Sequence, residues 1–494
     1  MKKFLPDLIA ILAFIILSFA YFFPADIEGR ILFQHDTAAG VGAGQESKEY
    51  LERTGERTRW TNSIFGGMPT YQMSPSYDST TSLKGVEKVY RLFLPDYVVL
   101  TFIMMLGFYI LLRAFGISAW LAGLGGVIWA FSSYFFILIP SGHIWKFVTL
   151  AYIPPTIAGV VLAYRKKYLL GGIVTALFIA LQIQSNHIQM SYYFMFVILF
   201  FVGAYFEDAY KKKELPHFFK ASGVLALAAV VGVCINISNL YHTYEYSKET
   251  MRGKSELKQE GAAASQTSSG LDRDYITNWS YGIGETLTLL VPNVKGGGSG
   301  STMSQSEAAM AKANPMYNGI YSQLPQYFGE QPWTAGPVYV GAFVMFLFVL
   351  GCFIVKGPLK WALLGATIFS ILLSWGKNFM GLTDFFIDYV PMYNKFRAVS
   401  SILVIAEFTI PLLAIFALKE ILSKPDMLKQ EKNCRGVIAA LVLTAGVALI
   451  LAVAPGTFFS SFITTQEMTA LKQALPAEHL APFVANLTEM REAI

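Results

Sequence analysis

Residues 168–206 read YLLGGIVTALFIALQIQSNHIQMSYYFMFVILFFVGAYF, two long apolar runs with a short polar turn between them. Each run is close to the ~20 residues that an α-helix needs to cross the hydrocarbon core of a bilayer. The pattern predicts a helical hairpin with spans over 168–186 and 189–206. Because similar apolar runs recur along the chain, we expect an all-α polytopic membrane protein.

The composition of the whole chain agrees with a membrane protein. Of its 494 residues, 54% are hydrophobic and 14% are charged, and the mean hydropathy is +0.47. Soluble domains carry about 25% charged residues. The net charge of +5 does not indicate nucleic acid, because basic residues in membrane proteins mainly set the topology. The three cysteines give neither a disulfide framework nor a metal-ligand spacing.

Hydropathy predicts about eleven membrane spans in all. They cover roughly residues 5–23, 97–112, 118–139, 147–164, 168–186, 189–206, 219–239, 337–355, 359–375, 400–418 and 436–454. The first run resembles a signal peptide, but its length and the many later spans favour an uncleaved signal anchor.

Basic residues gather on one side of these spans. They are Lys2, Lys3, Arg113, the run 165–167, the run 211–213, Lys356, Lys360 and the loop 419–435. The short loops on the other side hold only Lys146, Lys377, Lys395 and Arg397. The positive-inside rule therefore places the N-terminus in the cytoplasm, and we expect a multi-pass plasma membrane protein with an extracytoplasmic active face.

Three large segments then project outside, over residues 24–96, 240–336 and 376–399. We expect surface helices over 45–60 and 464–475, a short amphipathic helix within 376–399, and no regular element in the mobile Gly/Ser run 295–301. This division predicts a transmembrane domain over 1–455. Residues 456–494 would be the start of a C-terminal outer segment that belongs to a longer protein.

Polar side chains follow the outer ends of several spans. They are His35 and Asp36; His143 and Lys146; Asn186, His187 and Gln189; and Lys395 and Arg397. Tight outer loops bring these groups to one membrane face. We therefore expect them to line a pocket in the outer leaflet.

Each residue type in this set has a chemical and a plain interpretation. Asp36 is a candidate general base for a hydroxyl, or an ordinary helix-capping aspartate. His143 and His187 can donate to a phosphate, transfer protons or ligate a metal, or can be hydrogen-bonded histidines at the interface. With one histidine in each turn, a His-rich metal site is not expected. The amides of Asn186 and Gln189 can bond to sugar hydroxyls or link helices.

The basic residues and one acid inside a span likewise have a chemical and a plain interpretation. Arg397, Lys395 and Lys146 suit a phosphate group, or they extend toward lipid headgroups. Glu407 is an acidic residue well inside a span, which suggests a function. It can also be a protonated group that links helices next to the bend expected at Pro411.

Several outer motifs together resemble the YfhO family of bacterial membrane proteins, which is grouped with GT-C-type glycosyltransferases. The motifs are 33–36 (FQHD), Trp60 with 65–71 (FGGMPTY), 142–143 (GH) with Lys146, 186–189 (NHIQ), 327–330 (YFGE) with 336–341 (GPVYVG), and 395–397 (KFR). The resemblance implies a GT-C-like fold with Asp36, beside His35, as catalytic base. It also implies a polyprenyl-phosphate sugar donor, with its phosphate held by Arg397 and Lys395. It leaves open whether a divalent metal ion takes part.

The expected function is transfer of a sugar from this donor to a cell-envelope polymer or lipid acceptor, within membrane lipids and without nucleic acid. A transporter or flippase of lipid-linked envelope precursors is the first alternative, with Glu407, Pro411 and Pro154–Pro155 as mobile elements. A non-catalytic envelope scaffold is the second. Convergence of Asp36, His143, His187 and Arg397 on one cavity would favour the enzyme.

Overall fold

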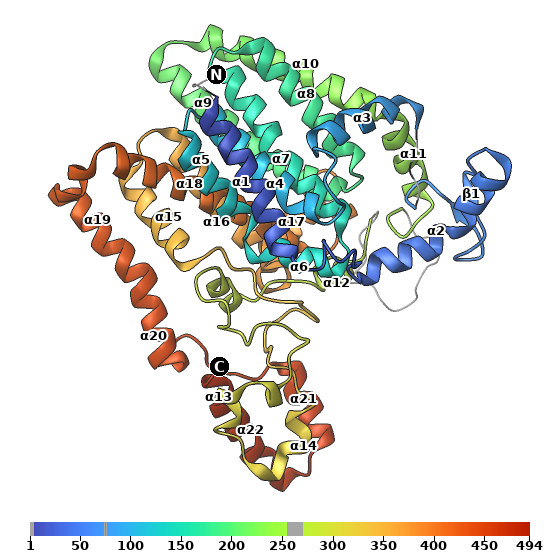
Figure 1. Cartoon of the computed structure of the whole chain (residues 1–494). Helices are drawn as coiled ribbons and strands as arrows, with labels where there is room; N and C mark the ends of the chain where they lie inside the picture. Colours follow the sequence, from blue (N-terminus) through green and yellow to red (C-terminus); the bar gives the residue numbers. More distant parts are fainter. Residues whose placement is uncertain (1–3, 74, 76, 254–269) are drawn as a thin grey trace. The chain divides into compact units, whose positions relative to one another are not determined.

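The computed structural model describes residues 4–73, 75, 77–253 and 270–494, so the predicted topology signals Lys2 and Lys3 lie outside the described residues (Figure 1). The chain divides into two compact units. Unit 1 takes its described residues from Met1–Phe131, Phe135–Lys258 and Lys356–Ala366. Unit 2 takes its described residues from Ser132–Tyr134, Gln259–Val355 and Thr367–Ile494.

Unit 1 is built from helices and a two-stranded antiparallel hairpin. Its elements are α1 (Leu5–Phe22), α2 (His35–Thr54), β1 (Trp60–Thr61), β2 (Met68–Pro69), α3 (Thr81–Tyr90), α4 (Val98–Ala114), α5 (Ala119–Ala130), α7 (Ile144–Tyr164), α8 (Tyr168–Gln184), α9 (Ile188–Lys212), α10 (Leu215–Ile235) and α11 (Ile237–Lys248). Two helices, α6 (Ser133–Ser141) and α16 (Pro358–Ser374), have residues in both units.

Unit 2 is also helical. Its helices are α12 (Arg273–Thr277), α13 (Glu307–Met310), α14 (Asn318–Tyr321), α15 (Ala342–Ile354), α17 (Met380–Tyr389), α18 (Val404–Ser423), α19 (Glu431–Leu441), α20 (Val447–Val453), α21 (Thr465–Ala474) and α22 (Ala477–Glu492). A π-helical turn over Val442–Gly446 joins α19 to α20. The outer segments therefore contain the helices expected near 376–399 and 464–475. The 295–301 run forms no helix or strand, as predicted.

The helices identify an all-α membrane protein, but the predicted number of spans needs correction. Among the described residues, six helices are long and apolar enough to cross a bilayer, or up to eight if two bent pairs each form one span. Three of the predicted spans are instead shorter apolar helices, α4, α8 and α15. At about 1.5 Å per residue, even the 17 residues of α4 extend only ~26 Å, less than the ~30 Å hydrocarbon core.

Helix α7 forms the core of unit 1. It packs against α4, α8, α9 and α10, and 94% of its apolar window is buried. Pro155 lies next to Gly107 of α4, where a Cβ atom would come within 2.5 Å of the Ala151 carbonyl oxygen. Only glycine at 107 permits this approach of the two backbones, in the way that small residues serve helix packing in membranes.

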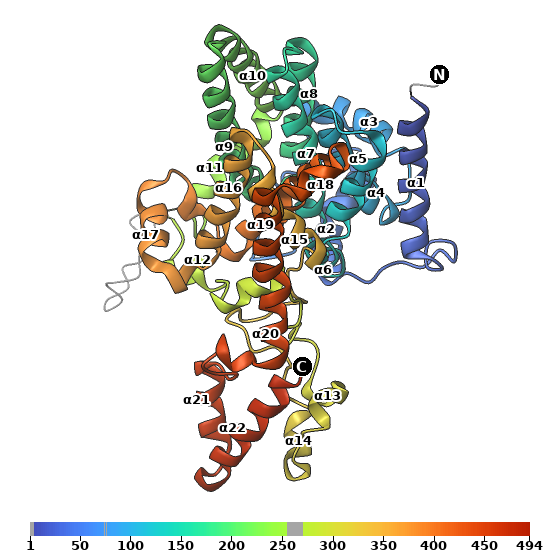
Figure 2. The ribbon, with the colours of Figure 1, turned by 90° about the vertical axis from the view of Figure 1, so that its left-hand side faces the viewer.

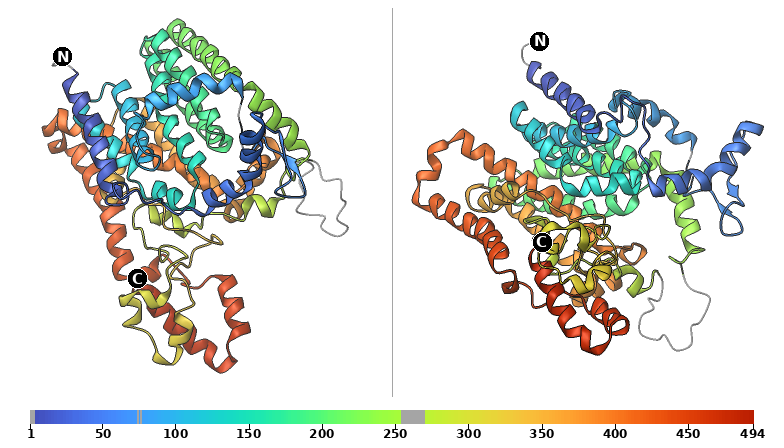
Figure 3. Two further views of the ribbon diagram at one scale, coloured as in Figure 1. Left: turned by 45° about the vertical axis from the view of Figure 1, so that its right-hand side comes forward. Right: turned by 60° about the horizontal axis from the view of Figure 1, so that its bottom comes forward.

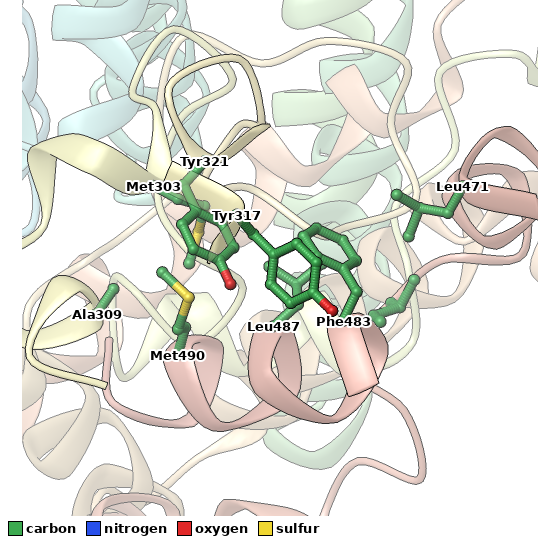
Figure 4. Close-up of a cluster of buried hydrophobic side chains, with 9 residues drawn as sticks. Met303, Ala309, Tyr317, Tyr321, Leu471, Phe483, Leu487 and Met490 are labelled. Atoms are coloured by element: carbon green, nitrogen blue, oxygen red, sulfur yellow. The ribbon is translucent and has the colours of Figure 1, made fainter. Parts of the chain in front are cut away.

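Unit 2 contains several hydrophobic centres, including one around α18 and one in the outer segments. The buried helix α18 packs against α15. Away from these helices, α13 and α14 of the second outer segment lie beside α21 and α22 of the C-terminal tail (Figure 2). The yellow and red ribbons run together in both views of Figure 3. Tyr321 and Phe483 stack at the centre of this cluster, 5.7 Å between ring centroids, with Met303, Leu487 and Met490 around them (Figure 4).

Candidate functional site

The candidate base Asp36 lies in the first turn of α2, a helix that begins ten residues before the surface helix predicted at 45–60. Gln34 precedes the helix with an extended backbone. The plain interpretation of Asp36 as a helix-capping residue is wrong, because Gln34 is the N-cap and no side chain caps this fully described helix. A carboxylate in the first turn still interacts favourably with the helix dipole. Its side chain remains 53% exposed, so it is also accessible to a substrate.

A close contact fixes Asp36 beside the turn that precedes α7. Gln34 donates its side-chain amide to the Ile139 carbonyl at 2.7 Å. Gly142 has a φ of +80°, and a Cβ atom there would lie 2.8 Å from the backbone nitrogen of Thr37. Glycine therefore supplies both the left-handed turn and the space for the start of α2.

This contact places His143 against the carboxylate. The His143 Nε2 atom lies 3.0 Å from Asp36 Oδ2, and His35 Nδ1 lies 3.3 Å from Asp36 Oδ1. Each of the two carboxylate oxygens of Asp36 therefore faces an imidazole. The two histidines come from different parts of the chain, because His35 begins α2 and His143 precedes α7. The structure thus brings together three of the residues that the sequence predicted for one site.

His187 and Lys146 extend the same electrostatic environment. Burial, together with the nearby charges of Lys146 and His143, lowers the pKa of His187 to about 3. His187 therefore remains neutral at physiological pH. Its Nδ1 atom is buried without a hydrogen-bond partner among the described residues, which leaves a polar atom available in the site.

The two predicted amides of unit 1 bond differently. Asn186 donates to Gln72 Oε1 at 3.5 Å and accepts from Asn239 at 3.3 Å. These bonds link the α8–α9 turn to α11, which supports the helix-linking interpretation of Asn186. Gln189 donates to the Tyr193 hydroxyl at 2.9 Å, a bond within α9 that does not link helices.

Lys395 and Arg397 belong to unit 2, and the structure does not bring them to Asp36 within one unit. Arg397 donates to the Tyr275 hydroxyl at 2.7 Å, with its guanidinium 5.3 Å from the Tyr275 ring centroid. Burial lowers the pKa of the Lys395 ammonium. Their shared site with Asp36 remains a prediction.

The intramembrane acid Glu407 is fully buried in α18. Ser132 donates a hydrogen bond to one of its carboxyl oxygens, and the other oxygen has no partner among the described residues. Helix α18 continues through Pro411 without a break. This geometry supports a role in linking polypeptide segments within unit 2.

Sequence reasoning missed two polar centres. In unit 2, Glu285 is buried and accepts from the Tyr327 hydroxyl and the Gly282 amide, both at 2.6 Å. In unit 1, the half-buried His242 stacks between Tyr71 and Tyr77, with centroids 4.8 and 5.6 Å away. No local spacing signals these contacts, because Tyr327, Tyr71 and Tyr77 lie far along the chain from the residues that they meet.

Among the described residues, no group of three or more His, Cys, Asp or Glu side chains is placed to hold a metal ion. Comparison with known proteins adds no relative: the chain matches no protein-family model, no curated protein and no solved structure.

Proposed function

We propose that this protein is a membrane glycosyltransferase that takes a sugar from a polyprenyl-phosphate donor, with Asp36 as the general base. The supporting observation is the Asp36–His143 pair, 3.0 Å apart and open to solvent, with Lys146 and His187 in the same electrostatic environment. A carboxylate beside imidazoles and a cation suits a hydroxyl acceptor and a phosphate leaving group. The family resemblance and the predicted outer orientation point to the same chemistry.

The reaction can be written with these groups. The acceptor hydroxyl gives its proton to a carboxyl oxygen of Asp36 while its oxygen forms a bond to the anomeric carbon. The bond between that carbon and the phosphate oxygen breaks, and the electron pair leaves with the polyprenyl phosphate. Lys146 would stabilise the charge that develops on the phosphate, which is often the largest catalytic contribution.

The test is sugar transfer by the purified full chain in lipid vesicles. Radiolabelled polyprenyl-phosphate hexoses serve as donors and washed bacterial envelope fragments as acceptors. We expect Asp36→Asn to lower the transfer rate about 10²–10⁴-fold, the range of a lost general base. Asp78→Asn is the matched control, since Asp78 is an exposed aspartate of the same outer segment, and it should transfer at the wild-type rate.

The transfer rates of the two variants are compared only if both proteins have the same thermal stability. Full transfer by a folded Asp36→Asn protein would eliminate Asp36 as the base. Equal losses in Asp36→Asn and Asp78→Asn would show a general effect of charge in this segment instead.

A further inference from the structure

A cavity of about 310 Å³ lies at the end of α7 that is remote from His143. Its lining comes from the last residues of α7, the C-terminal part of α9 and the start of α10. Helix α7 begins directly after His143 and its 21 residues extend about 30 Å. The cavity and the Asp36 site are therefore separated by roughly the thickness of a bilayer core.

The floor of the cavity is formed by three packed aromatic rings. Tyr164 stacks on Tyr205 at 4.5 Å and on Phe218 at 5.5 Å between ring centroids. The three rings belong to a buried hydrophobic cluster that joins α7, α9 and α10. Such a floor accepts the apolar start of a lipid tail or glycerol backbone.

The rim of the cavity is cationic. It carries Arg165, Lys166 and Lys212 against two acids, Asp208 and Glu214. Arg165 is anchored by a 2.5 Å hydrogen bond to the Ala114 carbonyl.

The two lysines of the rim can exchange their carboxylate partners for another anion with little loss of free energy. Lys166 pairs with Glu214 at 2.9 Å and Lys212 with Asp208 at 2.7 Å. All four side chains are at least 39% exposed, and such surface pairs contribute only about 0–1 kcal/mol. A lipid phosphodiester, whose single negative charge is shared by two oxygens, can therefore replace these carboxylates as the partner of the lysines.

We propose that this cavity binds the phosphate group of an anionic phospholipid headgroup in the leaflet opposite the Asp36 site. Basic pockets between membrane helices on the cytoplasmic side are suited to such headgroups. On the predicted orientation this is the cytoplasmic side. The inference does not depend on the reaction proposed for Asp36.

The chain offers a matched pair of double variants. Lys166→Ala with Lys212→Ala removes two lysines that line the cavity. Lys167→Ala with Lys211→Ala removes the lysines next to Lys166 and Lys212 in the sequence, and neither lines the cavity. Lys211 pairs with Glu207 as Lys212 pairs with Asp208. Both double variants lose the same charge from the same helix ends.

Binding is measured by native mass spectrometry of the full chain in detergent, titrated with phosphatidylglycerol or phosphatidylcholine. Wild type should bind phosphatidylglycerol more tightly than phosphatidylcholine. The cavity variant should lose about tenfold or more in affinity for phosphatidylglycerol, and the control variant less than about twofold. Equal losses in the two variants, or equal binding of both lipids by wild type, would overturn the proposal.

Two further arms identify the source of the phosphate and guard against misfolding. Inorganic phosphate should neither bind at millimolar concentration nor displace the lipid; if it does both, the ligand is a soluble phosphate and the lipid assignment is wrong.

Asp208→Asn with Glu214→Gln removes the competing carboxylates and should raise phosphatidylglycerol affinity several-fold. An unchanged or lower affinity in that variant contradicts the proposal even if the lysine variant fails to fold.

Discussion

At the scale of single residues, the neutral His187 gives the candidate site a defined pH dependence. Its folded-state pKa, about 3, lies below the ordinary value of 6.5 because burial and the charges of Lys146 and His143 disfavour the imidazolium. Above pH 6.5 the imidazole is neutral in both the folded and the unfolded chain, so it has no effect on stability. As the pH falls from 6.5 toward 3, only the unfolded chain takes up the proton, and stability is lost.

We therefore predict that the protein is less stable at pH 5 than at pH 8, with His187 responsible for about 2 kcal/mol of the difference. His187→Asn should remove that share of the pH dependence in thermal unfolding measured in detergent. His35→Asn is the control, because the His35 side chain is 84% exposed. A pH dependence identical in wild type and His187→Asn would show that the imidazole titrates normally.

The sequence could predict which residues lie at outer span ends, but not which of them meet. The predicted topology places Asp36 and His143 on one membrane face, and their contact agrees with that prediction. The contact itself depends on Gly142 and Thr37, whose backbones approach closely across separate elements. Arg397 binds Tyr275, more than a hundred positions earlier, and no local pattern indicates that pairing.

At the scale of elements, α2 is unusual because no residue of this fully described helix is buried. One acid ties it to the hairpin that follows. Glu46 accepts hydrogen bonds from the Thr61 hydroxyl at 2.5 Å and the Asn62 amide at 2.7 Å, and these bonds lower its pKa. The stabilisation is present above the ordinary carboxyl pKa and is lost as the pH falls through the lowered value.

We predict that Glu46→Ala frees the segment between α2 and β1. Trypsin should then cut at Arg57 and Arg59 several-fold faster than in wild type, because a mobile loop fits the protease. Glu49→Ala is the matched control on the same helix, since Glu49 bonds only to the side chain of Gln45 among the contacts described. If both variants are cut equally fast, α2 itself and not the Glu46 contact protects the segment.

Element lengths explain why the predicted spans were too many. Hydropathy finds apolar runs correctly, but it does not show where a helix ends. Helix α15 covers only 13 of the residues in the predicted span 337–355, because the chain before Ala342 is irregular. The predicted span 118–139 is two helices, α5 and α6, bent by 49°. Such breaks depend on packing and not on composition.

At the scale of the whole molecule, the C-terminal tail shares a hydrophobic core with the second outer segment. Arg491 of α22 donates to the Pro325 carbonyl, 166 residues earlier, and to both carboxyl oxygens of Glu467 at 2.7 Å. Sequence analysis separated residues 456–494 from the preceding domain because contacts between such distant positions leave no local signal.

We predict that Arg491→Ala destabilises this cluster by about 3–5 kcal/mol, because it leaves Glu467 and the carbonyls of Pro325 and Phe462 without a buried partner. Hydrogen exchange over residues 303–324 should accelerate accordingly. Arg435→Ala is the control, since the Arg435–Glu431 pair is about four-fifths exposed and such a pair contributes at most ~1 kcal/mol. If hydrogen exchange over residues 303–324 is unchanged in Arg491→Ala, the tail does not stabilise the outer segment through Arg491 and the prediction is wrong.

The close approach of α4 and α7 has a consequence for how the chain is made. Pro154 and Pro155 carry no N–H, so the carbonyls of Leu150 and Ala151 lack their helical donors. Such groups cost several kcal/mol each in bare hydrocarbon, and α7 is therefore poorly suited to stand alone in a bilayer. Helix α4 is synthesised first, and its Gly107 lets the backbone of α7 pack closely at the buried Ala151. The order of synthesis thus means that the packing partner of α7 has already been made when α7 follows.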